Sequence, residues 1–162
     1  LPSADSTHDI GSTTFKWANV YADTLNGTAV EALYADLAER FEADAEYSIG
    51  TVVSLGGAAE VTEVSEEASE SVFGVVSGKA AYLMNARAGS NATHPAIAMT
   101  GRVPVRVVGT VLKGQRLISS SIPGVARAAQ STEVNSFNVV GRALEDKYTH
   151  EEGTVLAVVR IN

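Results

Sequence analysis

Cysteine is absent from this chain of 162 residues, which excludes disulfide bonds and thiolate metal sites. Positive charge is scarce as well: 12 lysines and arginines stand against 19 aspartates and glutamates, and the formal net charge is -7. A nucleic-acid partner is therefore not expected, because phosphates require a basic surface. No apolar run approaches the roughly 18 residues that a membrane-spanning helix needs, so we expect no membrane insertion.

Targeting and catalytic signals are also missing. No signal-peptide pattern opens the chain, and because it starts at Leu1 we expect it to be a fragment of a longer protein. The histidines His8, His94 and His150 fall in three separate predicted loops. Neither a G-x-S-x-G turn nor a glycine-rich phosphate loop occurs. We therefore expect no enzymatic activity and no cofactor.

An acidic segment, residues 60–71, is the one stretch that invites interpretation as a metal site. Its carboxylates are Glu60, Glu63, Glu66, Glu67 and Glu70. Carboxylates alone, without the spacing of a calcium-binding loop, make a poor cage for an ion. We interpret the segment as a solvated face and expect no metal.

The densest strand signal lies in residues 101–129. Val103, Val105 and Val107 alternate with more polar neighbours, which is the period of a strand with one buried face. Pro104 has no amide hydrogen and so predicts an edge position or a bulge. Residues 155–161 are apolar on both faces, which predicts a strand buried on both sides. The sequence thus predicts a mainly β fold, either a compact sandwich or a barrel-like domain, over residues 29–162.

A short helix is predicted over residues 28–46. Thr28 and Glu31 have the spacing of a capping box. The apolar side chains that recur at intervals of three and four are Val30, Leu33, Leu37 and Phe41. This periodicity is typical of an amphipathic helix packed on a core.

Residues 1–28 are predicted to form an extended N-terminal arm. Its large apolar side chains are Ile10, Phe15, Trp17, Val20 and Tyr21. A segment of this length cannot build a core of its own, and burial of each such side chain is worth roughly 1.5–3 kcal/mol. We therefore expect the arm to pack on the main domain or on another chain.

Part of the arm resembles a known protein family. Asp9-Ile10-Gly11-Ser12, followed by the run from Phe15 to Ala22, FKWANVYA, resembles a segment common in tail fibre and tailspike proteins of tailed bacteriophages. In the second half, GRVPVRV at 101–107, KGQ at 113–115 and GRALE at 141–145 look like the terminal domain of such fibres. Gln115 stands where that family usually has an acidic residue, and this difference is expected to alter only a turn.

The resemblance implies a homotrimer at the distal end of a tail fibre of the virion. Its inter-chain contacts would involve Ile10, Phe15, Trp17, Val20, Tyr21, Leu33 and Leu37. Loops 86–95 and 130–138 would face a bacterial surface glycan or an outer-membrane protein. The receptor-facing candidates in them are Asn91, His94, Ser131, Asn135 and Asn138.

Two alternatives remain open. The segment ADLAERF at 35–41 resembles an element that, in self-cleaving relatives, carries acidic residues assigned to autoproteolysis. Asp36 and Glu39 match those positions, so the chain can instead be an autoproteolytic or intramolecular-chaperone trimerisation domain. The other alternative is a monomeric carbohydrate-binding module.

Overall fold

The computed structural model describes residue 3, residues 8–26 and residues 31–159. By its internal contacts the chain divides into two units, Leu1–Glu31 and Ala32–Asn162, and we describe each separately. The described residues of the first unit form bends and irregular chain, with neither helix nor strand. The second unit contains the sheet and the core.

Ten strands make up the regular structure of the second unit. They are β1 (Asp36–Arg40), β2 (Val52–Leu55), β3 (Val61–Glu63), β4 (Val72–Val76), β5 (Tyr82–Met84), β6 (Ala96–Val107), β7 (Arg116–Ser119), β8 (Ala126–Ala128), β9 (Gly141–Ala143) and β10 (Gly153–Val159). The mainly β fold predicted from the sequence is confirmed.

The predicted helix over residues 28–46 is wrong for the residues that the structure describes. Residues 28–30 lie outside them, and Asp36–Arg40 is the strand β1. β1 pairs in parallel with β5 and antiparallel with β6, and these ladders are with segments far away in the sequence. Leu33 is 87% exposed, whereas Phe41 packs edge-on against Phe73. The apolar residues at intervals of three and four therefore do not lie on one common face. Non-local pairing overrides the local periodicity.

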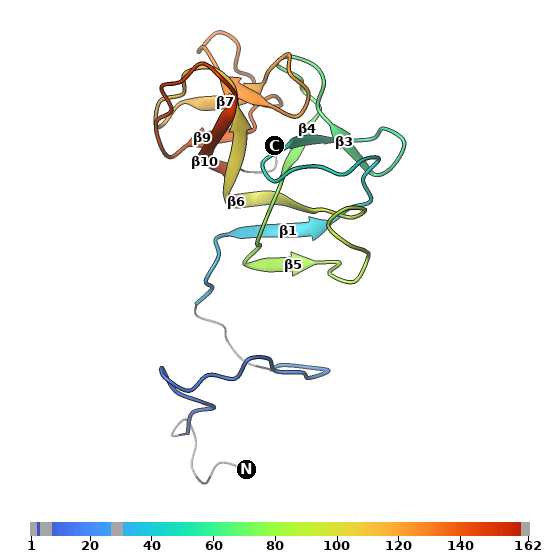
Figure 1. Cartoon of the computed structure of the whole chain (residues 1–162), viewed down its shortest axis with the longest axis vertical. Helices are drawn as coiled ribbons and strands as arrows, with labels where there is room; N and C mark the ends of the chain where they lie inside the picture. The colour runs from blue at the N-terminus through green and yellow to red at the C-terminus, as the bar shows by residue number, and fades with distance from the viewer. Residues whose placement is uncertain (1–2, 4–7, 27–30, 160–162) are drawn as a thin grey trace. The chain divides into compact units, whose positions relative to one another are not determined.

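Strand pairing closes five strands into a small barrel. β10 pairs with β9, β9 with β7, β7 with β8, β8 with β6, and β6 with β10. A second run of strands has the order β5-β1-β6-β4-β2-β3, and an isolated bridge between Ala43, which follows β1, and Val61 of β3 links two of its members. β6 belongs to both arrangements, and Figure 1 shows it lying beside β1 at one end and beside β10 at the other.

Gly101 allows β6 to take part in both arrangements. It pairs with Asp36 of β1 and with Val159 of β10, so the two registers meet at this residue. Its φ is +110°, and a Cβ there would lie 2.2 Å from the carbonyl oxygen of Ala35. Only glycine combines this backbone conformation with so close an approach.

Pro104 is accommodated because its missing amide hydrogen is not needed. It stands opposite Leu156 of β10. The amide of Leu156 donates to Glu145 at 2.7 Å, and its carbonyl accepts from Leu144 at 2.7 Å, so both groups point away from Pro104. On its other side β6 pairs with β8 only at Val107. The proline thus occupies a position without ladder bonds.

The core is built mainly from valine. The predicted alternation of Val103, Val105 and Val107 is confirmed, since all three are fully buried. In β10, Val155, Ala157 and Val159 are buried, but Val158 is 42% exposed, so the prediction that this strand is buried on both faces is wrong. The side chain of Val158 lies on the outer face of the barrel and stays partly exposed. A smaller cluster consists of Val53, Val61, Val76 and Ile97, and Phe41 and Phe73 are among the partly buried residues packed against it.

We predict that Gly101→Ala destabilises the second unit by about 3 kcal/mol, because an added methyl group meets backbone at a strained φ. Gly109→Ala is the matched control: its φ is +76°, but a Cβ there has nothing within 4 Å. The control should lose only about 1 kcal/mol, for the backbone conformation alone. Denaturant unfolding measures the free energy of unfolding of both variants. Equal losses would show that the close approach at Gly101 does not contribute to stability.

Candidate functional site

The apolar side chains of the first unit are exposed. Exposure runs from 69% for Trp17 to 92% for Tyr21 and includes Ile10, Phe15 and Val20. Leu25, which sequence analysis did not single out, is 87% exposed. The described residues of this unit therefore give its apolar groups no cover, and an apolar set of this size is typical of an association surface.

A tight turn presents two of these aromatic residues. The Ser12 amide donates to the carbonyl of Phe15 at 2.8 Å, and the Phe15 amide donates to Ser12 Oγ at 3.0 Å. Gly11, with φ +88°, opens the turn. Phe15 and Trp17, together with Gly11 and Lys16, line a shallow hollow of about 320 Å³. The turn thus holds the backbone of Phe15, and Trp17 follows it two residues later with its ring exposed.

A second hollow, of about 550 Å³, lies in the β-rich unit beside β1. Leu33, Tyr34 and Ile49 expose apolar surface to it, and Lys79 Nζ stands 5.8 Å from the centre of the Tyr34 ring. Leu33 therefore lies where an inter-chain contact would cover it. Leu37, the other predicted contact residue of this unit, is half-buried on β1.

Asp36 and Glu39, the pair considered for autoproteolysis, are not brought together. They are three residues apart on β1, so their side chains leave opposite faces of the strand. Asp36 is buried, and within the described part of the chain its Oδ2 has no hydrogen-bond partner. Glu39 is half-buried. The arrangement offers no shared site at which one carboxyl could act as acid and the other as base.

Arg40 organises the loop that contains Asn91 and His94. Its Nη1 donates to Asn91 Oδ1 at 2.9 Å and to the carbonyl of His94 at 2.6 Å. Asn85 Nδ2 in turn donates to the carbonyl of Arg40 at 3.1 Å. Asn91 stays exposed while its carbonyl is occupied, and His94 is half-buried with its ring against the Thr93 hydroxyl. The loop is held by side chains of the barrel-and-sheet unit itself.

The loop of residues 130–138 is also held by internal hydrogen bonds. Asn135 is exposed, and its Oδ1 accepts from the amides of Phe137 and Asn138, at 2.8 and 3.1 Å. Its Nδ2 donates to Glu70 at 2.7 Å. Ser131 is exposed, as expected of a loop tip.

Asn138 does not face outward, contrary to the prediction. It is 2% exposed; its Nδ2 donates to the carbonyl of Glu133, and its Oδ1 accepts from the Asn135 amide. The side chain closes the loop internally, so its role is structural. Phe137, in contrast, is 61% exposed, and sequence analysis did not select it. A large aromatic residue in an otherwise polar loop was the available signal, because aromatic rings are common at binding surfaces.

An ion-pair cluster anchors the same loop. Arg127 forms a two-pronged contact with Glu133, at 2.7 and 3.0 Å, and its Nε donates to Glu67 at 2.8 Å. The Gln130 amide also donates to Glu133. The hydrogen bond from Arg127, aided by that from Gln130, lowers the pKa of Glu133 from 4.5 to about 2. The pKa of Arg127 is raised, mainly by its hydrogen bond to Glu133.

Across residues 3, 8–26 and 31–159, no group of three or more histidine, aspartate or glutamate side chains is arranged to hold a metal ion. Within the same residues, no helix has the length and hydropathy to cross a membrane. A scan against protein-family models and a search of curated proteins both give no match. The function is therefore argued from the residues.

We predict that Glu133 titrates with a midpoint near pH 2. Because its folded-state pKa lies below 4.5, the ion pair stabilises the loop fully above about pH 4.5. That stabilisation is lost as the pH falls through about 2. An NMR titration of the Glu133 carboxyl measures the midpoint directly.

The matched variants are Arg127→Gln and Arg87→Gln. The first should move the Glu133 midpoint back toward 4.5, because it removes the main cause of the low pKa. The second changes an exposed arginine elsewhere and should leave the midpoint where it was. A midpoint near 4.5 in the unmodified protein would rule out the ion pair in solution.

Proposed function

We propose that this chain is the terminal part of a tail fibre of a tailed bacteriophage, which trimerises the fibre and contributes to binding a receptor on the host surface. The proposal places it at the distal end of the fibre, in the virion. Its partners are two further copies of the same chain and a bacterial surface glycan or outer-membrane protein. The resemblance of the arm and of the β-rich segments to fibre proteins is the starting point.

The exposed apolar residues of the first unit carry the proposal. Phe15, Trp17 and their apolar neighbours have no cover within their own unit. Burial of each side chain is worth about 1.5–3 kcal/mol, so association that covers several of them in each of three copies is strongly favourable. Repulsion between like charges opposes this association little, because Lys16 is the only charged residue in the segment from Ile10 to Val20.

The hollow beside β1 supplies a second contact in the proposal. Leu33 and Tyr34 stand at its rim and expose apolar surface in the single chain, as does Ile49. β5, the outer strand on this side, is an edge whose free backbone groups another copy can approach. Association through this face would shelter both the edge and the rim.

The receptor role rests on two loops held by a stiff scaffold. Arg40 fixes the loop of residues 86–95, and Arg127 fixes the loop of residues 130–138. Binding residues placed on such loops lose little conformational entropy when a ligand engages them. Three copies would repeat each weak contact, and avidity would then raise the overall affinity.

The test is the solution mass of the protein by light scattering. We predict a trimer for the unmodified chain and a monomer for the double variant Phe15→Ser, Trp17→Ala. Tyr148→Ala is the control, since it removes an exposed aromatic ring from the β-rich unit.

The control should remain a trimer. Circular dichroism of each variant checks that the β-rich unit is folded. A monomeric unmodified chain would overturn the proposal and favour a monomeric carbohydrate-binding module. A double variant with unchanged mass would remove the arm from the interface.

A further inference from the structure

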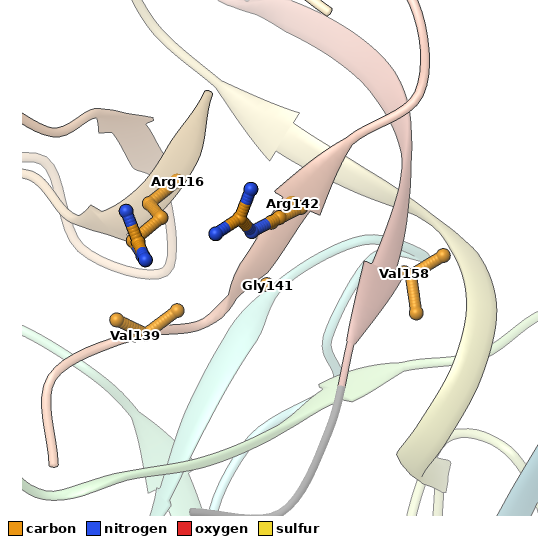
Figure 2. A pocket seen from close by; sticks show the side chains of 5 residues that line it. All are labelled: Arg116, Val139, Gly141, Arg142 and Val158. Carbon is orange, nitrogen blue, oxygen red and sulfur yellow. The ribbon is translucent and has the colours of Figure 1, made fainter. Parts of the chain in front are cut away.

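Two arginines stand directly opposite each other on neighbouring strands of the barrel. Arg116 of β7 is in register with Arg142 of β9. Figure 2 shows the two side chains coming from adjacent strands, with their guanidinium groups turned toward the same space. Like charges at directly opposed positions of an antiparallel pair destabilise the sheet. Both side chains are exposed, so water screens part of this repulsion, and an anion in the space between them would relieve the rest.

No carboxylate in the described part of the chain neutralises this pair. Arg106 and Arg127 form ion pairs at 2.7 to 2.8 Å, whereas neither Arg116 nor Arg142 makes one with any described residue. Acidic residues are not in short supply, since they outnumber lysine and arginine by 19 to 12. No carboxylate of the described residues therefore competes with an external anion for these two guanidinium groups.

The arginines line a hollow together with apolar residues. Its volume is about 310 Å³, and its other lining residues are Val139, Gly141 and Val158. A Cβ at Gly141 would lie 2.4 Å from the carbonyl oxygen of Val158, so glycine is needed for β9 and β10 to lie this close. The volume is at the lower end of the range for small-ligand pockets, about 300–1,000 Å³. It suits one sugar ring rather than an extended chain.

We propose that this hollow binds the anionic group of an acidic saccharide, either a sugar carboxylate or a sugar phosphate. Guanidinium forks match the paired oxygens of both groups and hold them by two parallel hydrogen bonds. Val139 and Val158, which also line the hollow, supply apolar contacts for the sugar ring. The inference rests on the proposed receptor-binding function and names the ligand class for a surface glycan.

The negative net charge of the chain affects how strongly the site can attract an anion. The whole chain carries a formal charge of -7, so its long-range field repels anions. Attraction has to come from the local contact with two arginines, which acts within a Debye length of about 8 Å at physiological salt. Binding should therefore be weak for a single sugar and should fall as salt is raised.

NMR titration of the full chain tests the site, with glucuronate, glucose 1-phosphate, methyl glucuronate ester and inorganic phosphate as probes. We expect glucuronate, glucose 1-phosphate or both to bind with Kd on the order of 1 mM, and the neutral ester not to bind. Which acidic sugar binds identifies the anionic group. Binding by neither acidic sugar would overturn the proposal. Equal binding of inorganic phosphate and glucose 1-phosphate would overturn recognition of a saccharide.

The variants are Arg116→Gln, Arg142→Gln and the double change, with Lys113→Gln as the control, because it removes an exposed positive charge outside the hollow. Each single change should weaken binding about tenfold, because it removes one charge-assisted contact. Lys113→Gln should bind as the unmodified chain does. A double variant that retains its affinity would overturn the proposal, whatever the other probes show.

Thermal unfolding gives an independent readout. Without ligand, Arg142→Gln should raise Tm by roughly 1–3 °C, because it removes repulsion between opposed like charges. Excess acidic sugar should raise the Tm of the unmodified chain and leave that of the double variant unchanged. A lower Tm for ligand-free Arg142→Gln would contradict the repulsion on which the inference rests.

Failure here can be told apart from failure of the proposed function. A trimer that binds neither acidic sugar overturns this inference alone. A monomer that binds an acidic sugar through Arg116 and Arg142 overturns the trimeric fibre and keeps the site.

Discussion

The close approach of Gly101 to the backbone of Ala35 and Asp36 is the contact on which the rest of the β-rich unit depends. At this point β6 passes from its pairing with β1 and β4 to its pairing with β10 and β8. One continuous strand therefore joins the second run of strands to the barrel. A side chain at position 101 would push the backbone of β6 away from Ala35 at the residue where the two registers meet, and would weaken both pairings.

The two regions proposed to meet a ligand are held by different means. The loops of residues 86–95 and 130–138 lie outside the regular ladders for most of their length, and each is held by an arginine whose hydrogen bonds are made within the unit. Arg116 and Arg142 are instead fixed by strand register, with no loop involved. Strand-borne side chains are held more precisely than loop-borne ones, which suits recognition of one anionic group.

Sequence patterns predicted the parts of the fold that depend on local alternation. The alternation of Val103, Val105 and Val107 predicts a strand with one buried face. Successive side chains of a strand point to opposite faces because of the backbone geometry alone, so every second residue shares a face. The segment of residues 31–46 was misassigned because its spacing of apolar residues fits a helix, while the energy that decides its structure comes from β5 and β6. Single-sequence reasoning has no access to a partner about 60 residues further along the chain.

The same limit explains the outcome for individual site residues. The exposed apolar set around Trp17 was predictable, since no neighbouring sequence offers cover. The burial of Asn138 was not, because it depends on the carbonyl of Glu133 and the amide of Asn135 meeting its side chain. Arg116 and Arg142 lie opposite each other because of the register of β7 against β9. The sequence around either residue does not indicate that register.

Some arginines of this molecule form internal hydrogen bonds, and others do not. Arg40, Arg106 and Arg127 each donate to oxygen atoms of the chain itself, so their charge is committed to holding loops and strands. Arg116 and Arg142 have no such commitment to described residues, and they stand on an acidic chain that has carboxylates in excess. Pairing either arginine with a glutamate would stabilise the sheet, so the chain forgoes a favourable cross-strand pair at this position. The proposed recognition of an external anion would account for this choice, because the anion would supply the opposite charge that the sheet lacks here.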